Sequence, residues 1–264
     1  MMLLVDAWGE GDGTRKSRKT ICAGIEAIFG AVPPDAWFEP EEDAYGKSYP
    51  RLKKRCGELT RQRGWTAALV AEFVRNLYSR NDGGWMARAS GRVDLDYNAA
   101  AELAEALNAF DRSNQAVKKL VDIASRLVNN SMVGASKFLH FCLPGIYAIT
   151  DQFLRLVSGT PSRGTRDGVS RAEAARISRA EAAYYCTYMA ALNQVDRKYA
   201  KLAMRWARKV FKYRVTRVRA IEAFVFYHVK EYDYGRFPLL APVMPKKPRH
   251  AEKKAGTSRY CRKR

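Results

Sequence analysis

The hydrophobic residues of this chain recur mostly at the spacing of amphipathic helices. The same spacing predicts helices over residues 20–29, 52–61, 65–78, 97–110, 199–213 and 216–232. Ser-Arg-Ala-Glu occurs at both Ser170 and Ser178, and each copy fits a capping box, so a further helix is expected from one of these serines to Leu192. The most regular helix precedes residue 129, where apolar residues fall at i, i+3, i+4 and i+7: Val117, Leu120, Val121, Ala124, Leu127 and Val128. The pattern therefore predicts an all-α protein.

Several helix ends can be predicted from short polar or glycine signals. Gly30 is the usual kind of residue beyond a helix end, so it is expected to close the helix over residues 20–29. Asp111-Arg112-Ser113 is expected to end one helix and to cap the next. Asn129-Asn130 should end that next helix, because Asn tolerates the left-handed backbone conformation found at helix ends.

The segment that follows Asn130 contains shorter elements. Gly134 permits a tight turn, and Ser136 is placed to begin a short helix that carries Lys137 on its first turn. Pro144-Gly145 breaks this helix, and Asp151 directly precedes another that runs to about residue 157. The segment is thus predicted to form helix, hairpin, helix, loop and helix, with a lysine at the head of the middle helix and a carboxylate at the head of the last.

This arrangement resembles the core of the helix-hairpin-helix DNA glycosylases, a superfamily that includes the 8-oxoguanine glycosylases. In that family a Gly-rich hairpin binds backbone phosphate, a Lys on the following helix attacks the sugar in the lyase members, and an Asp at the head of the next helix supports the reaction. The resemblance covers about residues 115–158 and implies a helical glycosylase-like core. The matching positions are Val133, Gly134 and Ala135 for the hairpin, Lys137 for the nucleophile and Asp151 for the carboxylate.

The match departs from the family pattern at two points, and its residues also have simpler interpretations. Ser131-Met132 stands where the family has Pro-Gly, and the 14 residues that separate Lys137 from Asp151 are fewer than in the 8-oxoguanine enzymes. An Asp before a helix is usually an N-cap, worth about 1 kcal/mol. His140 and Phe141 are candidates for lining a base pocket, although aromatic residues at this spacing more often belong to a core.

Positive charge is concentrated at the end of the chain. The formal net charge is +20, and residues 197–264 contain 21 Lys and Arg against four acids. Such polarity favours a polyanionic partner, most simply nucleic acid, bound through its phosphates. The resemblance to the glycosylases implies double-stranded DNA as that partner. From residue 237 the sequence becomes Pro-rich and then basic, which predicts a disordered tail over 237–264 that adds nonspecific phosphate affinity.

A second basic feature lies on the helix predicted over residues 199–213. Like charges at this spacing repel one another, and no acid relieves them, so we favour a phosphate-facing surface over an ordinary solvated one. Residues 158–169 are expected to form either a mobile loop that adds two more arginines or, equally, a solvated linker. The predicted phosphate contacts are Lys201, Arg205, Arg208 and Lys212 on the helix, and Arg163 and Arg166 on the loop.

The remaining composition excludes several classes of protein. Five widely spaced cysteines fit neither a disulfide framework nor a zinc site, and three histidines make a metal cluster an unfavourable interpretation, so no metal or other cofactor is predicted. No signal segment or apolar run of membrane-spanning length occurs, which predicts a cytoplasmic, nucleic-acid-associated protein without a membrane partner. His228, on a predicted apolar face, is expected to be a satisfied core residue.

These observations lead to one main hypothesis and two alternatives. The main hypothesis is a DNA-binding protein related to base-excision glycosylases, acting in DNA repair or defence. Its candidate chemistry is N-glycosylase and lyase activity on a flipped base, through Lys137. One alternative is a noncatalytic nucleic-acid-binding protein with the same fold, and the other is a basic interaction protein for an acidic partner. The expected organisation is an arm and helix over 1–33, a helical core over 34–196, basic helices over 197–236 and the tail; the sequence does not indicate an oligomeric state.

Overall fold

A computed structural model describes residues 12–40, 44–60, 64–79, 93–129, 131–151, 153–154, 157 and 171–244. The described part of the chain is all-α, and its only non-helical pairing is a single antiparallel bridge between Leu95 and Val128. The helices are α1 (Asp12–Ala31), α2 (Ala44–Thr60), α3 (Ala67–Tyr78), α4 (Tyr97–Asn108), α5 (Asn114–Leu127), α6 (Met132–Cys142), α8 (Arg171–Gln194), α9 (Arg197–Val210) and α10 (Arg217–Asp233), with short 3-10 helices η1 (Pro34–Ala36) and η3 (Pro238–Leu240).

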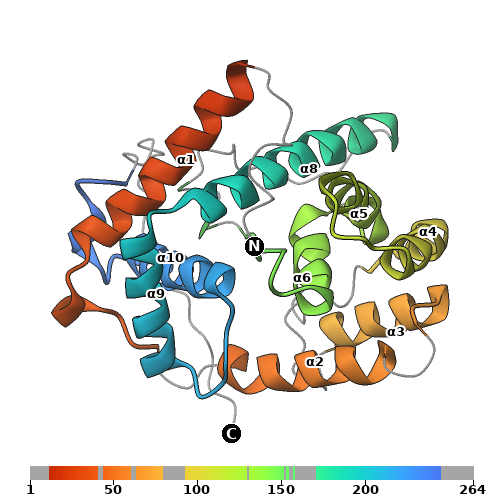
Figure 1. Cartoon of the computed structure of the whole chain (residues 1–264), viewed down its shortest axis with the longest axis horizontal. Coiled ribbons are helices and arrows are strands. Elements are labelled where there is room, and N and C mark those ends of the chain that lie inside the picture. Colours follow the sequence, from red (N-terminus) through yellow and green to blue (C-terminus); the bar gives the residue numbers. More distant parts are fainter. Residues whose placement is uncertain are drawn as a thin grey trace, which may run out of the picture.

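The helices surround α6, which packs against α2, α3, α5 and α8 (Figure 1). In this view α1 and α8 run side by side along the upper edge, α9 and α10 lie at the left, α2 and α3 follow the lower edge, and α4 and α5 lie at the right. The short helix expected to carry the lysine is therefore the central element of the fold. No helix in the described ranges is long and apolar enough to cross a membrane.

Short polar side chains begin most of these helices. The Asp96 carboxylate accepts hydrogen bonds from two first-turn amides of α4, and the Ser113 hydroxyl accepts one from the Ala116 amide of α5. The Thr216 hydroxyl accepts a bond from the Arg219 amide of α10. Each bond satisfies an amide that has no partner within its own helix, which stabilises the helix by roughly 1 kcal/mol. The prediction that Ser113 caps a helix is confirmed.

Two predicted helices are longer than expected. The helix predicted over 20–29 is α1, which runs from Asp12 to Ala31 and contains Gly30 within its last turn. The helix predicted over 52–61 is α2, which begins at Ala44 and includes Pro50. Tyr49 and Leu52, which flank Pro50 within α2, are both buried. Packing of this part of α2 against the core therefore outweighs the proline, which had suggested that the helix begins only after residue 50.

An aromatic cluster joins α9 and α10 to the segment after η1. The indole Nε1 of the fully buried Trp206 donates to the Phe38 carbonyl, at 2.8 Å, and the Phe38 amide donates to Nε2 of His228, at 3.0 Å. Because Nε2 accepts, Nδ1 carries the proton and donates to the Phe224 carbonyl. His228 is thus a satisfied core residue, as predicted, and burial lowers its pKa to about 4.

The packed part of the chain extends beyond residue 236, where the tail was expected to begin. Leu240 in η3 is completely buried, and Met244 is nearly so. The Met244 amide donates to the Leu240 carbonyl, which continues the turn after η3. Residues 237–244 therefore belong to the folded body, and the basic segment from 245 onward lies outside the described residues.

Candidate functional site

The turn between α5 and α6 forms earlier in the chain than predicted. Asn129 has a left-handed φ of 51°, as expected for its role in ending α5. Its side-chain oxygen also accepts a hydrogen bond from the Asp94 amide, at 2.8 Å. The Ser131 amide donates to the Val128 carbonyl across this turn, at 2.9 Å. Helix α6 begins directly afterwards at Met132 rather than at Ser136, so Lys137 lies on its second turn instead of its first.

Gly134 lies inside the first turn of α6 and not in a hairpin loop. It is buried, and a Cβ at this position would come within 2.5 Å of the Tyr78 hydroxyl oxygen. The Ala135 amide donates to the Ser131 carbonyl, at 3.0 Å, so it belongs to the helix hydrogen-bond ladder and is not available to a phosphate. Val133 is only partly buried and its amide lies in the first turn, so it is the best placed of the three predicted hairpin contacts.

Lys137 and Asp151 lie within electrostatic reach of each other, as the sequence-based hypothesis requires. The Lys137 side chain is 8% exposed, on the face of α6 that meets the interior. Burial lowers the pKa of Lys137 because the ammonium loses its hydration, while Asp151 and Glu222 oppose this shift and Arg219 adds to it. The environment therefore favours a neutral, nucleophilic amine more than water would.

Asp151 combines two roles that were considered separately from the sequence. One carboxylate oxygen accepts hydrogen bonds from the amides of Phe153, at 2.8 Å, and Leu154, at 3.0 Å, which is the geometry of an N-cap. Burial raises the pKa of Asp151, and these two amides and Lys137 act in the opposite direction. The prediction that Asp151 precedes a helical turn is confirmed, and its charge also interacts with Lys137.

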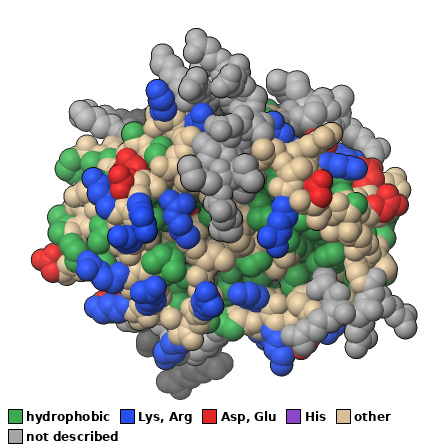
Figure 2. Space-filling model, in the orientation of Figure 1, with side chains coloured by type: hydrophobic (Ala, Val, Ile, Leu, Met, Phe, Trp, Pro, Cys, Tyr) green, Lys and Arg blue, Asp and Glu red, His purple; other side chains and the backbone are tan. Residues whose placement is uncertain are grey.

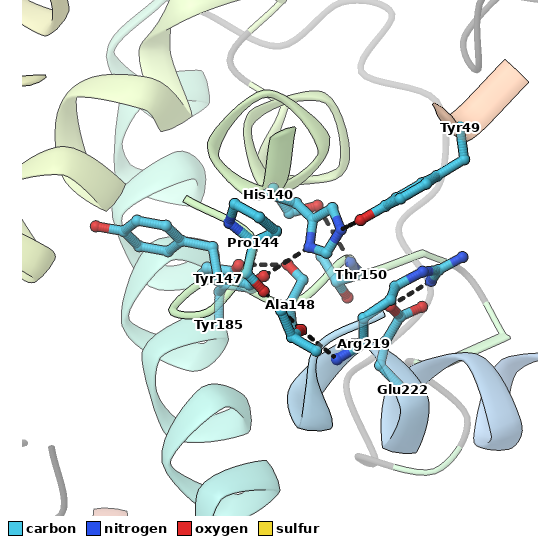
Figure 3. Close-up of polar contacts among 11 residues, drawn as sticks. Tyr49, His140, Pro144, Tyr147, Ala148, Thr150, Tyr185, Arg219 and Glu222 are labelled. Atoms are coloured by element: carbon cyan, nitrogen blue, oxygen red, sulfur yellow. Dashed lines mark hydrogen bonds and ion pairs between the residues drawn. The ribbon is translucent and has the colours of Figure 1, made fainter. Parts of the chain in front are cut away.

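The loop that leads to Asp151 is held by side chains from α6, α8 and α10, several of which Figure 3 shows. Five of its backbone groups bond to side chains, which supplies them with the partners that buried backbone groups need. The bonds run from Thr216 Oγ1 to the Pro144 carbonyl (2.8 Å), from His140 Nδ1 to the Tyr147 carbonyl (2.7 Å), from Tyr185 Oη to the Ala148 carbonyl (2.5 Å), from the Ile149 amide to Glu222, and from the Thr150 amide to Ser136 Oγ (3.1 Å). Three helices thereby determine where Asp151 lies relative to Lys137.

Three polar residues that the sequence did not single out complete this buried cluster. Arg219 and Glu222 form an ion pair on α10, and both are almost completely buried (Figure 3). Burial raises the pKa of Glu222 to about 7, although Arg219 opposes the shift. Tyr188, 3% exposed on α8, interacts electrostatically with Glu222 and Asp151, and its hydroxyl has no hydrogen-bond partner within the described part of the chain. A signal was present for the α10 pair, since two opposite charges three residues apart interrupt an apolar helix face.

His140 and Phe141 both belong to the core. Tyr49 Oη donates to His140 Nε2 at 2.8 Å, because Nδ1 of the same ring carries a proton toward the Tyr147 carbonyl. Burial lowers the pKa of His140 to about 3, so the ring is neutral. Phe141 is 3% exposed and its ring lies against those of Tyr49 and Phe73. Their contact with a flipped base therefore stays a prediction, and their burial among aromatic rings favours the core interpretation.

The basic stripe predicted on α9 is exposed for most of its length. Lys201, Arg205 and Arg208 all lie at the surface of the helix, and the Arg205 guanidinium lies over the Trp37 ring, 5.0 Å from its centroid. Lys212 is also exposed but follows the end of α9, so it extends the stripe into the next link rather than along the helix. Arg163 and Arg166 lie outside the described residues.

No part of the described chain groups three or more His, Cys, Asp or Glu side chains as a metal site would. Comparisons with models of protein families, with curated proteins and with solved structures found no match to this chain. The resemblance to helix-hairpin-helix glycosylases therefore remains a prediction based on residues 115–158. Two features of the fold therefore bear on function: the geometry around Lys137 and Asp151, and the position of the exposed basic residues.

Proposed function

We propose that this protein binds DNA and acts as a base-excision N-glycosylase with lyase chemistry through Lys137. The observation that carries the proposal is the electrostatic interaction between the buried Lys137 and the partly buried Asp151, which is held near the centre of the fold by a loop that three helices fix. A lysine kept from water is unusual, since burying a charged group is costly unless it is paired or loses its charge. Such groups occur preferentially at functional sites, where a shifted pKa suits the chemistry.

The proposed reaction follows from the chemistry of a neutral amine near a carboxylate. A nucleotide flipped out of the duplex would present C1′ to Lys137 Nζ. The amine forms a bond to C1′ while the glycosidic bond breaks, and the base leaves with the bonding electrons and takes up a proton. The amine then loses a proton, and the sugar ring opens to an imine as its ring oxygen gains one. The Asp151 carboxylate would stabilise the positive charge that develops on the sugar and accept the amine proton.

A noncatalytic nucleic-acid-binding protein is the second candidate, and one observation favours it. Lys201, Arg205 and Arg208 are exposed on α9, whereas Lys137 is almost fully buried. Binding through the surface residues therefore does not require any reaction at the buried pair. This candidate predicts DNA binding without release of a base or cleavage of a strand.

An activity assay on duplexes with damaged, modified or missing bases separates these candidates. Free-base release and strand cleavage should both occur for the wild-type protein on at least one substrate. Lys137→Met should abolish strand cleavage, and Asp151→Asn should lower the rate by roughly 10²- to 10³-fold, the usual effect of removing one electrostatic stabiliser. Asn is as good an N-cap as Asp, so the second variant keeps the cap and removes only the charge. DNA binding with no product from any substrate would leave the noncatalytic candidate.

A further inference from the structure

The middle of α2 carries a group of basic residues that the sequence pattern did not connect with binding. Arg51, Lys53, Lys54 and Arg55 are all exposed. Glu58 forms ion pairs with Lys54 and Arg55, and Glu72 forms another with Arg55. Arg51 and Lys53 form no ion pair with any carboxylate in the described ranges, so their charges face solvent.

A stacked aromatic pair places this group beside the basic residues of α9. The rings of Tyr49 in α2 and Tyr213 lie 4.8 Å apart, with 13° between their planes. Tyr213 belongs to the link between α9 and α10, where it is flanked by the exposed Lys212 and Arg214. The start of α2 therefore lies against this link, as Figure 1 also shows. Figure 2 shows Lys and Arg side chains in a row across the lower left of the molecule, where Figure 1 places α9 and the start of α2.

This surface is not simply a consequence of the high overall charge. Helix α4, on the other side of the molecule in Figure 1, exposes Glu102 and Glu105 and contains no Lys or Arg. Exposed charge is thus distributed unevenly, with several basic residues on α2 and α9 and acidic residues on α4. An uneven field of this kind steers a polyanion toward the more basic side.

The same aromatic pair connects the basic surface to the candidate active site. Tyr49 Oη donates to His140 on α6, three residues after Lys137 in the same helix. The Arg219 guanidinium lies over the Tyr49 ring, 5.6 Å from its centroid, and Arg219 also interacts with Asp151. A strand bound along the basic surface would therefore run close to the Lys137–Asp151 pair.

We infer that α2, the α9–α10 link and α9 form one continuous phosphate-binding surface for duplex DNA. This inference rests on the proposed DNA-binding function and assigns the residues that contact the backbone. A duplex suits the surface because it offers one negative charge every roughly 3.4 Å along each strand, so one molecule can neutralise cations on all three elements. The residues are Arg51 and Lys53 on α2, Lys212 and Arg214 on the link, and Lys201, Arg205 and Arg208 on α9.

The test measures binding of the full chain to a fluorescent duplex over a range of salt concentrations. The α2 variant is Arg51→Gln/Lys53→Gln. The matched control, Arg75→Gln/Lys119→Gln, removes the same number of exposed charges from α3 and α5. Each lost phosphate contact reduces the magnitude of the slope of log K against log salt by about 0.9, so the α2 variant should lose about 1.8. Its affinity deficit relative to the wild type should therefore be roughly tenfold larger at about 50 mM salt than at about 200 mM. The control should keep the wild-type slope.

The possible results distinguish this inference from the proposed function. An α2 variant with the wild-type slope, while Lys201→Gln/Arg208→Gln lowers it, would remove α2 from the interface but leave DNA binding in place. Wild-type protein that binds no duplex would overturn both the inference and the proposed function. Equal binding of polyglutamate in competition with the duplex would indicate an acidic protein partner and would overturn the assignment to DNA. A slope lowered only by the α2 and α9 variants supports the inference.

Discussion

The contact between Gly134 and Tyr78 provides a sharp test of the structure around the candidate site. Replacing Gly134 by Ala adds one methyl group in the first turn of α6. That Cβ would lie 2.5 Å from the Tyr78 hydroxyl oxygen, much closer than two such atoms can approach, while the next Tyr78 atom, Cζ, would lie at 3.6 Å. The clash therefore depends on a single oxygen atom, and Tyr78→Phe removes that atom without emptying the site.

Two opposing effects determine the stability of Gly134→Ala. Ala is favoured over Gly in a helix by about 0.8–1 kcal/mol, and overpacking of a buried site costs about 1–3 kcal/mol. In the wild-type background the second effect should dominate, giving a net loss of about 1 kcal/mol. In the Tyr78→Phe background the methyl group makes an ordinary contact with the ring, so the same substitution should stabilise the protein by about 0.5–1 kcal/mol.

The measurement is a double-mutant cycle in which urea unfolding of each protein is monitored by far-UV circular dichroism. The four proteins give a coupling energy between the two positions of about 1–3 kcal/mol, and the stability lost in Tyr78→Phe alone cancels from it. A coupling energy below about 0.5 kcal/mol would refute the packing of Tyr78 on α6, since that is the usual limit for independent sites. Comparing DNA affinity in Tyr78→Phe and Gly134→Ala/Tyr78→Phe would also show whether Gly134 has a role beyond packing.

Three further predictions concern the buried polar groups. His228 has a folded pKa of about 4, below the unfolded value of about 6.5, so the unfolded chain binds the proton first and stability is lost as the pH falls through this range. Between pH 7 and 5 the wild type loses about 2 kcal/mol of its free energy of unfolding through this group. The urea midpoint of His228→Gln should therefore depend less on pH than that of the wild type, and an identical pH dependence would contradict a buried neutral ring. Tyr185→Phe leaves the Ala148 carbonyl without its hydroxyl donor and should cost about 1–3 kcal/mol in urea unfolding, whereas a loss under about 0.5 kcal/mol would show that this bond does not hold the loop. Asp151→Ala should lose about 1 kcal/mol of cap energy and Asp151→Asn much less, and equal losses in thermal unfolding would argue against the N-cap.

Much of the helical architecture could be predicted because local signals and burial agree there. The apolar periodicity of α5, the Ser113 cap and the left-handed Asn129 are local features, and the structure contains all three. The position of Asp151 before a helical turn was predictable for the same reason. These features depend on residues within a few positions of one another, which is the range over which a single sequence is informative.

The parts that could not be predicted depend on contacts between distant segments. The beginning of α6 was misplaced because Gly134 suggested a turn, whereas its lack of a side chain accommodates Tyr78 from α3. His140 was ambiguous because its partner Tyr49 lies 91 residues away. Arg219 is one of 47 basic residues, and its spacing from Glu222 on an apolar helix face indicates a buried ion pair but not that the pair lies close to Asp151, which comes from another part of the chain.

The central claim, that Lys137 is a nucleophile in a DNA-binding protein, is tested most directly by borohydride trapping. Borohydride reduces an imine between a lysine and the opened sugar to a stable amine, so protein and DNA become covalently joined. The full-length protein and Lys137→Met should be compared on duplexes that bear damaged or modified bases or an abasic site, and the attachment site should be mapped by peptide mass spectrometry. We predict an adduct at Lys137 that is absent from the variant. An adduct at another residue, or none on any duplex that the protein binds, would contradict the assignment.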